Sequence, residues 1–318
     1  MTARGLGIAI FSLVAVASSA CRHHASNKLT PQEAAWDAHH EAEREGRIDE
    51  AISGYRAQCD GEPVYVRACY DLARALFEAG RTTEAREAAE RFIAENPSDA
   101  LAPAAAAHLA RSFSDEGEAD VGIAALEALL AKISGEDVWD TVQYEIAGLH
   151  RIREDAAGES AALERIVKKG RWGSQLWDDS LWRLIEISRE QGERDREKGF
   201  LARFVDSREE SRLIGSYNSK YHDDALLRLG TMELEDGRLD RAYELFMQLA
   251  HWKTSRMRDD GYYWAAVVRV RQGKNGAACE LMRELSEEMP ESSSDDEAAE
   301  LMRKVGCVES SAGSRANQ

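Results

Sequence analysis

The sequence predicts an all-α protein, an α-solenoid of about seven helix-turn-helix repeats that ends in a C-terminal capping helix. Two observations predict this fold. In residues 66–99, apolar residues recur at helical spacing on two successive segments. The glycine and proline positions that mark turns and ends also recur, because 34 residues separate Gly46 from Gly80 and also Pro63 from Pro97. Such a unit cannot bury its apolar face alone, so we expect neighbouring units to stack on one another.

The unit at 66–99 shows what each repeat contains. Its first helix carries one apolar stripe, Gly80-Arg81 forms the turn, and the second helix ends at Pro97. Small residues at Ala73 and Ala85 allow the two backbones to approach closely. The apolar positions are Leu72, Ala73, Leu76 and Phe77, followed by Ala85, Ala89 and Phe92. Segments 226–250 and 262–285 repeat the same order of helix, glycine turn and alanine.

These residues resemble a tetratricopeptide (TPR) repeat, and the resemblance covers about 31–306. Two segments look most like TPR proteins of the bacterial envelope. They are RFIAENPSDALAPAAAAHLA (91–110) and NSKYHDDALLRLGTMELEDGRLDRAYELF (218–246). Similar proteins include the TPR lipoprotein of the outer-membrane β-barrel assembly complex and the Tol–Pal-associated TPR protein. The resemblance implies a concave groove that binds part of another protein.

The remaining repeats follow at wider spacing. The first helix begins at Thr30-Pro31 with a capping box and runs to about Glu45. Residues 206–220 form a connection longer than usual between helices. Residues 295–306 are expected to be a capping helix, followed by a disordered tail at 307–318. The later turns are expected at Gly117, Glu154, Gly192, Gly237 and Gly273, which are 37, 37, 38, 45 and 36 residues apart, counted from Gly80.

The N-terminus is predicted to be a targeting segment. Arg4 precedes the apolar run Leu6 to Ala17, and small residues lead to Cys21. The pattern resembles a bacterial lipoprotein signal at 1–20, with a lipidated Cys21 and a tether over 21–30. Ser18 stands where this signal usually has Leu. The alternative is an ordinary secretory signal with Cys21 as a free or paired thiol. Arg22 after the cysteine implies sorting to the outer membrane rather than the inner membrane.

The other four cysteines form an even set in an exported chain, which suggests disulfides. Cys279 and Cys307 are almost equidistant from a predicted loop near 292–293, so an antiparallel hairpin would bring them together. Cys59 and Cys69 flank the loop at Gly61–Pro63 in the same way, less symmetrically. We expect both pairs. The alternative is four buried free thiols, which helical cores often contain.

Aromatic residues mark a candidate binding groove. When the repeats are aligned by their turns, the fifth position of the first helix is Trp or Tyr in five of seven repeats. In TPR proteins this position faces the concave groove. The ninth position is basic in the first three repeats, and aromatic and Arg side chains are typical of binding hot spots. The candidate residues are Trp36, His40, Tyr70, Arg74, Arg111, Tyr144, Trp182 and Tyr263. The alternative is that these aromatics pack between repeats, and the cluster Trp172, Trp177 and Trp182 is interpreted as core.

Charge and motifs limit the function. A net charge of −17 argues against nucleic acid, whose binders are usually basic. The chain has no glycine-rich phosphate loop, His-Glu-x-x-His or Cys-x-x-Cys motif. Acidic pairs such as Asp223-Asp224 and Asp259-Asp260 suit helix N-termini. We therefore expect no catalytic residue, cofactor or metal.

The expected function is that of a non-catalytic scaffold. It would be lipid-anchored to the outer membrane, face the periplasm, and contact the membrane through its N-terminal lipid only. Its groove would bind a peptide segment of an envelope protein in a barrel-assembly, Tol–Pal, motility or secretion complex. The alternative is a glycan-binding solenoid associated with peptidoglycan-processing enzymes.

Overall fold

The computed structural model describes residues 29–133, 138–207, 219–290 and 295–307, and these residues form fifteen helices and no strand. This confirms the predicted all-α solenoid. Cys21, the expected signal and residues 308–318 of the tail expected at 307–318 lie outside the described residues, whereas Cys307 is described. The helices are α1 (Pro31–Arg44), α2 (Ile48–Cys59), α3 (Val66–Glu78), α4 (Thr82–Glu95), α5 (Ala102–Asp115), α6 (Ala119–Leu130), α7 (Val138–Ile152), α8 (Ala156–Lys168), α9 (Trp177–Glu190), α10 (Arg194–Asp206), α11 (His222–Glu235), α12 (Leu239–His251), α13 (Arg258–Arg271), α14 (Asn275–Glu288) and α15 (Asp295–Val305).

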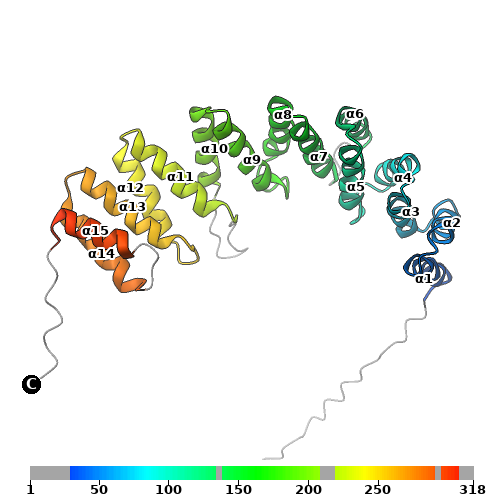
Figure 1. The fold of residues 1–318 in the computed structure, drawn as a ribbon, viewed down its shortest axis with the longest axis horizontal. Helices are drawn as coiled ribbons and strands as arrows, with labels where there is room; N and C mark the ends of the chain where they lie inside the picture. Colours follow the sequence, from blue (N-terminus) through cyan, green and yellow to red (C-terminus); the bar gives the residue numbers. More distant parts are fainter. Residues whose placement is uncertain (1–28, 134–137, 208–218, 291–294, 308–318) are drawn as a thin grey trace, which may run out of the picture.

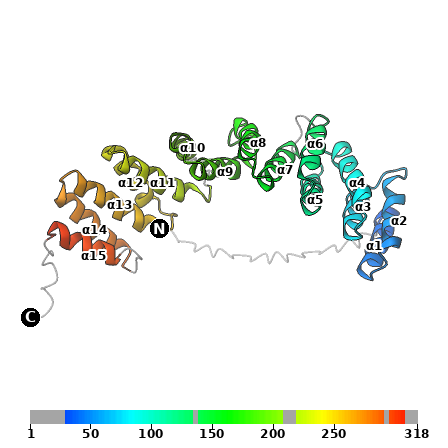
Figure 2. The same cartoon turned by 45° about the horizontal axis from the view of Figure 1, so that its top comes forward.

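The helices pair into seven repeats, from α1–α2 to α13–α14, and α15 packs on α13 and α14 at the C-terminal end. Figure 1 shows the repeats in an arched row, in which each repeat contacts mainly its neighbours. From α3 to α10 the odd-numbered helices lie on the inner side of the arch, and the view in Figure 2 agrees. In the second to fifth repeats, the inner side is therefore formed by the first helix of each repeat.

Each turn between paired helices contains one residue in the left-handed region. In six repeats this residue is a glycine, as at Gly80, where φ is 70° and Arg81 N–H donates to Leu76 O at 2.9 Å. The fourth repeat makes the same turn with Glu154, whose φ is 57°, and Asp155 N–H donates to His150 O. A side chain in this conformation costs about 1 kcal/mol more than glycine. The turn that the sequence marks only weakly is thus geometrically regular.

The middle repeats are joined differently from the others. Near the start of the second helix, most repeats have a buried alanine such as Ala51, Ala85, Ala242 or Ala278. The equivalent positions in α8 and α10 hold buried Glu159 and Glu197. Their carboxylates accept hydrogen bonds at 2.8 Å from Arg183 and Arg228 of the following repeat. At these two positions an ion pair therefore joins successive repeats, whereas a buried alanine methyl group occupies the equivalent position in most of the other repeats.

Both expected cysteine pairs are bonded. Cys59 at the end of α2 is joined to Cys69 in α3, and their Cα atoms lie 4.8 Å apart. Cys279 in α14 is joined to Cys307, just beyond α15, with a Cα separation of 5.6 Å. The second bond fixes the capping helix to the last repeat. None of the helices in the described ranges has the length and apolar character needed to span a membrane.

The helix bounds differ slightly from those read in the sequence. In the third repeat, the alanine-rich segment 104–113 lies within α5, which extends two residues beyond it at each end. The apolar segment 121–133 that follows overlaps α6, which begins two residues before it and ends at Leu130. Helix ends are set by turn hydrogen bonds, such as that from Lys132 N–H to Leu129 O, which the apolar pattern does not reveal.

Candidate binding surface

The eight predicted binding residues all lie on odd-numbered helices, in α1, α3, α5, α7, α9 and α13. The structure brings four of them together in a network between α1 and α3, which consists of Trp36, His40, Tyr70 and Arg74 with their partners. It places the other four separately along the solenoid.

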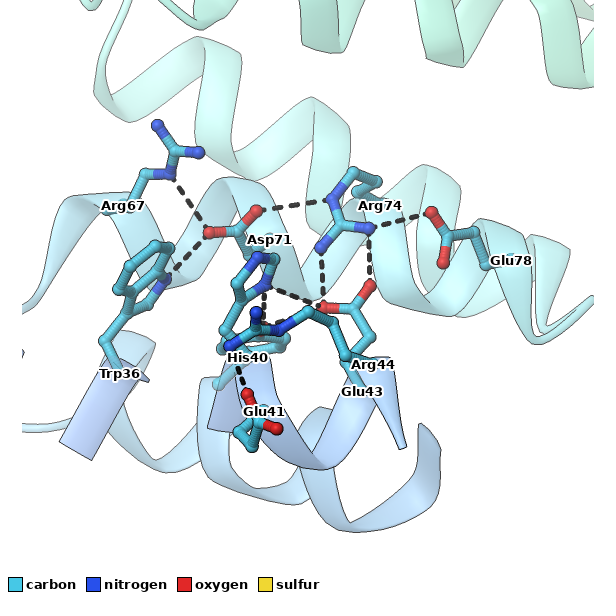
Figure 3. Close-up of polar contacts among 10 residues, drawn as sticks. Trp36, His40, Glu41, Glu43, Arg44, Arg67, Asp71, Arg74 and Glu78 are labelled. Atoms are coloured by element: carbon cyan, nitrogen blue, oxygen red, sulfur yellow. Dashed lines mark hydrogen bonds and ion pairs between the residues drawn. The ribbon is translucent and has the colours of Figure 1, made fainter. Parts of the chain in front are cut away.

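The buried carboxylate of Asp71 is the centre of the α1–α3 network (Figure 3). Its side chain is 2% exposed. Trp36 Nε1–H donates to Asp71 Oδ2 at 2.8 Å, and Arg67 Nε–H donates to the same oxygen at 3.1 Å. Arg74 Nε–H donates to Oδ1 at 3.3 Å. Asp71 thus uses both oxygens within the chain and connects the first two repeats.

Arg74 also pairs with Glu43, which is 8% exposed (Figure 3). Both terminal nitrogens of Arg74 donate to this carboxylate, one of them at 2.7 Å to Oε2, and Glu78 accepts a further hydrogen bond at 2.7 Å. The Tyr55 hydroxyl donates to Glu43 at 2.8 Å. Burial raises the pKa of Glu43, but the hydrogen bonds from Arg74 and Tyr55 outweigh it and lower this pKa below its ordinary value. The predicted basic residue Arg74 is therefore surrounded by three carboxylates.

The aromatic side chains of the network contact one another and its cations. The Trp36 ring stacks on His40, with centroids 5.2 Å apart and an interplanar angle of 9°. The Arg67 guanidinium lies 5.5 Å from the Trp36 centroid and 5.9 Å from that of Tyr70. Tyr70 is buried and packs on Phe92. At this end, the aromatic residues serve as contacts between and within repeats, which is the packing alternative.

Trp182 and Tyr263 also pack within the chain. Trp182 stacks on Tyr221 at the start of the next repeat, with centroids 4.9 Å apart and an interplanar angle of 4°, and meets the edge of Phe204. Tyr263 is half-buried against the C-terminal part of the core and contacts Trp264 edge to face. Both residues are half-buried, and each contacts an aromatic ring of its own chain.

Arg111 and Tyr144 lie by hollows in the surface. Arg111 is exposed on α5, beside a small hollow of about 170 Å³ that Phe77 and His108 also line. Tyr144 of α7 lines a larger cleft of about 990 Å³, which we call the central groove. This groove reaches across three repeats, from the start of α5 to the start of α9. Its lining residues are Pro103, Asp140, Thr141, Tyr144, Glu145, Asp178 and the segment 171–176.

Trp172 is the side chain of the central groove that the sequence interpretation misplaced. We interpreted it as core, but it is 66% exposed, the highest value among the exposed large apolar side chains that the structure describes. Trp177, five residues later, is buried as expected. Gly170 and Gly173 flank Trp172, and Gly170 has a φ of 78°, so the segment is a connection between α8 and α9. These two glycines were the signal in the sequence that could have placed Trp172 outside the core.

The groove carries carboxylates in two different states. Asp140 accepts a hydrogen bond from Lys169 Nζ at 2.7 Å and is therefore paired. Asp178 accepts from the Ser219 hydroxyl at 2.8 Å, and no cation among the described residues lies within ion-pairing distance of it. Half-buried Glu145 makes no ion pair or hydrogen bond with the described part of the chain. Burial raises the pKa of Glu145, and the nearby charges of Arg111 and Arg151 offset only part of this rise.

No cluster of three or more His, Cys, Asp or Glu side chains suited to a metal ion occurs in the described ranges. The acidic pairs Asp223-Asp224 and Asp259-Asp260 lie in the first turns of α11 and α13, where the helix dipole favours negative charge.

The paired helices, the turns and the spacing of 34 residues at the N-terminal end can be compared with known families. Residues 42–109 match the tetratricopeptide repeat family model. This segment contains α2 to α4 and most of α5, including Asp71 and Arg74. No curated protein sequence matches the chain.

Solved structures similar to this chain include other helical-repeat proteins. The chain is 15% identical to one chain of Naa15/Naa10 bound to HypK-THB, with a TM-score of 0.45, and covers 39% of that chain with 87% of its own length. It is 18% identical to YrrB, a TPR protein with an unusual peptide-binding site, with a TM-score of 0.40 and coverage of 68% of this chain and 99% of that one. Pseudomonas aeruginosa pilF is 13% identical to this chain, with a TM-score of 0.38 and coverage of 75% of this chain and 97% of that one. Because all these TM-scores are below 0.5, we transfer no function from these structures.

Proposed function

We propose that this protein is a non-catalytic scaffold that binds a peptide segment of an envelope protein on the inner side of its solenoid. The observation that supports this proposal is the central groove, an open cleft of about 990 Å³ with aromatic and unpaired acidic side chains. The TPR repeat at 42–109 and the row of stacked helices suggest protein binding rather than catalysis. A scaffold of this kind presents an extended surface without needing a reactive group.

The location forms the second part of the proposal. We infer from the sequence of residues 1–22 that a lipid on Cys21 holds the chain at the periplasmic face of the outer membrane. Two disulfides are consistent with an exported protein, because such bonds persist in oxidising compartments. The bound protein would then belong to an envelope assembly such as a barrel-assembly, Tol–Pal, motility or secretion complex.

Affinity purification of the native, membrane-anchored protein from its own cells, followed by mass spectrometry, tests both parts. We expect a stoichiometric envelope protein to co-purify, and we expect the chain to carry a lipid on Cys21. The Cys21→Ser variant, purified in parallel, should lose the membrane fraction but keep its helical circular dichroism. A soluble native protein with an unmodified Cys21 would overturn the anchoring. Purification with peptidoglycan fragments alone, and no protein, would overturn the scaffold proposal.

A further inference from the structure

We propose that the central groove binds a peptide in which an apolar or aromatic residue lies next to a lysine or arginine. This inference rests on the proposed function, because it names the site and the chemical class of the segment that the scaffold binds. The occupant is a segment of another protein, and the groove's apolar wall, its charge and its dimensions point to this kind of segment.

The apolar wall of the groove contains an exposed tryptophan, Trp172. The other six tryptophans of the chain are buried or half-buried, whereas Trp172 is 66% exposed. It lines the groove together with Tyr144 and Leu176. Tryptophan and tyrosine are the residues most enriched in binding hot spots, because each buries a large apolar area at low entropic cost. An apolar side chain of a peptide would remove this indole from water.

The charge of the groove selects a cation. Glu145 and Asp178 have no cation within ion-pairing distance among the described residues. Arg171 of this wall donates to the carbonyl of Ser207 and lies over the Trp172 ring at 5.3 Å, and nearby Lys169 pairs with the lining residue Asp140. A lysine or arginine of the peptide would supply the missing positive charge. The net charge of −17 also disfavours an acidic segment.

The α1–α3 network shows how similar aromatic and acidic side chains are occupied elsewhere in the molecule. There, the chain's own Arg67 and Arg74 neutralise Asp71 and Glu43, and Arg67 also lies against Trp36 and Tyr70. Aromatic rings beside carboxylates thus already receive cationic side chains in this protein. The central groove also places carboxylates beside aromatic rings, but its Glu145 and Asp178 have no ion-pair partner among the described residues. Its volume of about 990 Å³ equals that of a large ligand site and accommodates several side chains of an extended peptide.

Selection from an unbiased dodecapeptide library on the full chain tests the inference. Enriched peptides are resynthesised with a fluorescent label, and their dissociation constants are measured by anisotropy at low and high salt. We expect enrichment of Lys or Arg beside an aromatic or large aliphatic residue. We expect Trp172→Ala to weaken binding about tenfold or more, and Glu145→Gln to weaken it about fivefold at low salt and less at high salt.

Matched controls separate the groove from general effects of charge and exposure. Glu127→Gln removes an exposed carboxylate of α6, and Val121→Ala shortens an apolar side chain of α6 that is 56% exposed. Both should leave the dissociation constants unchanged within about twofold. If peptides bind but are acidic, or bind Trp172→Ala as well as the parent chain, the inference is wrong and the scaffold proposal survives. If no peptide is enriched, both are contradicted.

Discussion

The α1–α3 network and the central groove contain similar side chains in opposite states. In the network, buried carboxylates hold arginines and a tryptophan of the adjacent helix, so the two repeats are fixed to one another. In the groove, Glu145 and Asp178 have no ion-pair partner among the described residues, and Trp172 is exposed. An aromatic residue beside charged side chains in this solenoid is therefore either a joint between repeats or part of a binding surface. The partners of its charges decide which.

The largest effect is expected from breaking the network at its centre. Asp71→Ala leaves Arg67, Arg74 and the Trp36 indole N–H without their shared acceptor, and removal of one partner of a buried ion pair costs about 3–5 kcal/mol. Urea unfolding followed by circular dichroism measures this loss in the free energy of unfolding. Asp37→Ala is the control, since exposed Asp37 occupies the equivalent position of the first repeat and should change stability by at most about 0.5 kcal/mol. Equal effects of the two variants would refute the joint role of Asp71.

The C-terminal disulfide should give the next largest effect and lies outside both regions. Replacing Cys279 and Cys307 together by serine removes a cross-link over a separation of 28 residues, for which the chain-entropy estimate is about 3 to 4 kcal/mol. Because α15 packs mainly on α13 and α14, amide hydrogen exchange should accelerate first in α15. Unchanged exchange there would mean that packing alone holds the cap. Exchange in the α1–α3 network should remain as in the parent chain.

A smaller effect separates the two tryptophans. Trp36→Phe keeps a ring but removes the N–H that donates to buried Asp71, which should cost about 1–2 kcal/mol of unfolding free energy. Trp172→Phe changes an exposed ring and should cost about 0.5 kcal/mol or less. Both values come from the same urea titration. The comparison between joint and binding surface fails if Trp172→Phe costs as much as Trp36→Phe.

The smallest effect concerns pH and has opposite signs in the two regions. The pKa of Glu43 is lowered below 4.5, so its stabilising contribution is present above pH 4.5 and is lost as the pH falls through its folded-state pKa. The pKa of Glu145 is raised above 4.5, so its contribution is lost as the pH rises through its folded-state pKa. Glu145→Gln should therefore be slightly more stable than the parent chain at pH 7, and Glu43→Gln less stable. Stability curves from pH 3 to pH 7 that shift in the same direction would contradict these assignments.

The fold was predictable because its signals are local. Gly80, Pro97 and an apolar stripe lie within one unit, and the spacing of 34 residues is visible in the sequence alone. Even the unmarked turn at Glu154 could be placed from its neighbours. The state of each candidate residue was not predictable in the same way. Arg74 looked like a free basic residue because Glu43 lies 31 residues away in another repeat. Whether Trp172 is exposed depends on how the 171–176 connection packs against α5 and α7.

Site-specific photo-crosslinking in the native cells tests directly whether the central groove is the binding surface. One photoreactive residue is placed at Trp172 in the central groove, and another at exposed Asp37, which lies on α1 next to the network. If the partner binds in the central groove, position 172 should give a specific protein adduct and position 37 little or none. An adduct from position 37 alone would show that the partner binds at the N-terminal end, and it would contradict the assignment of the central groove as the binding surface.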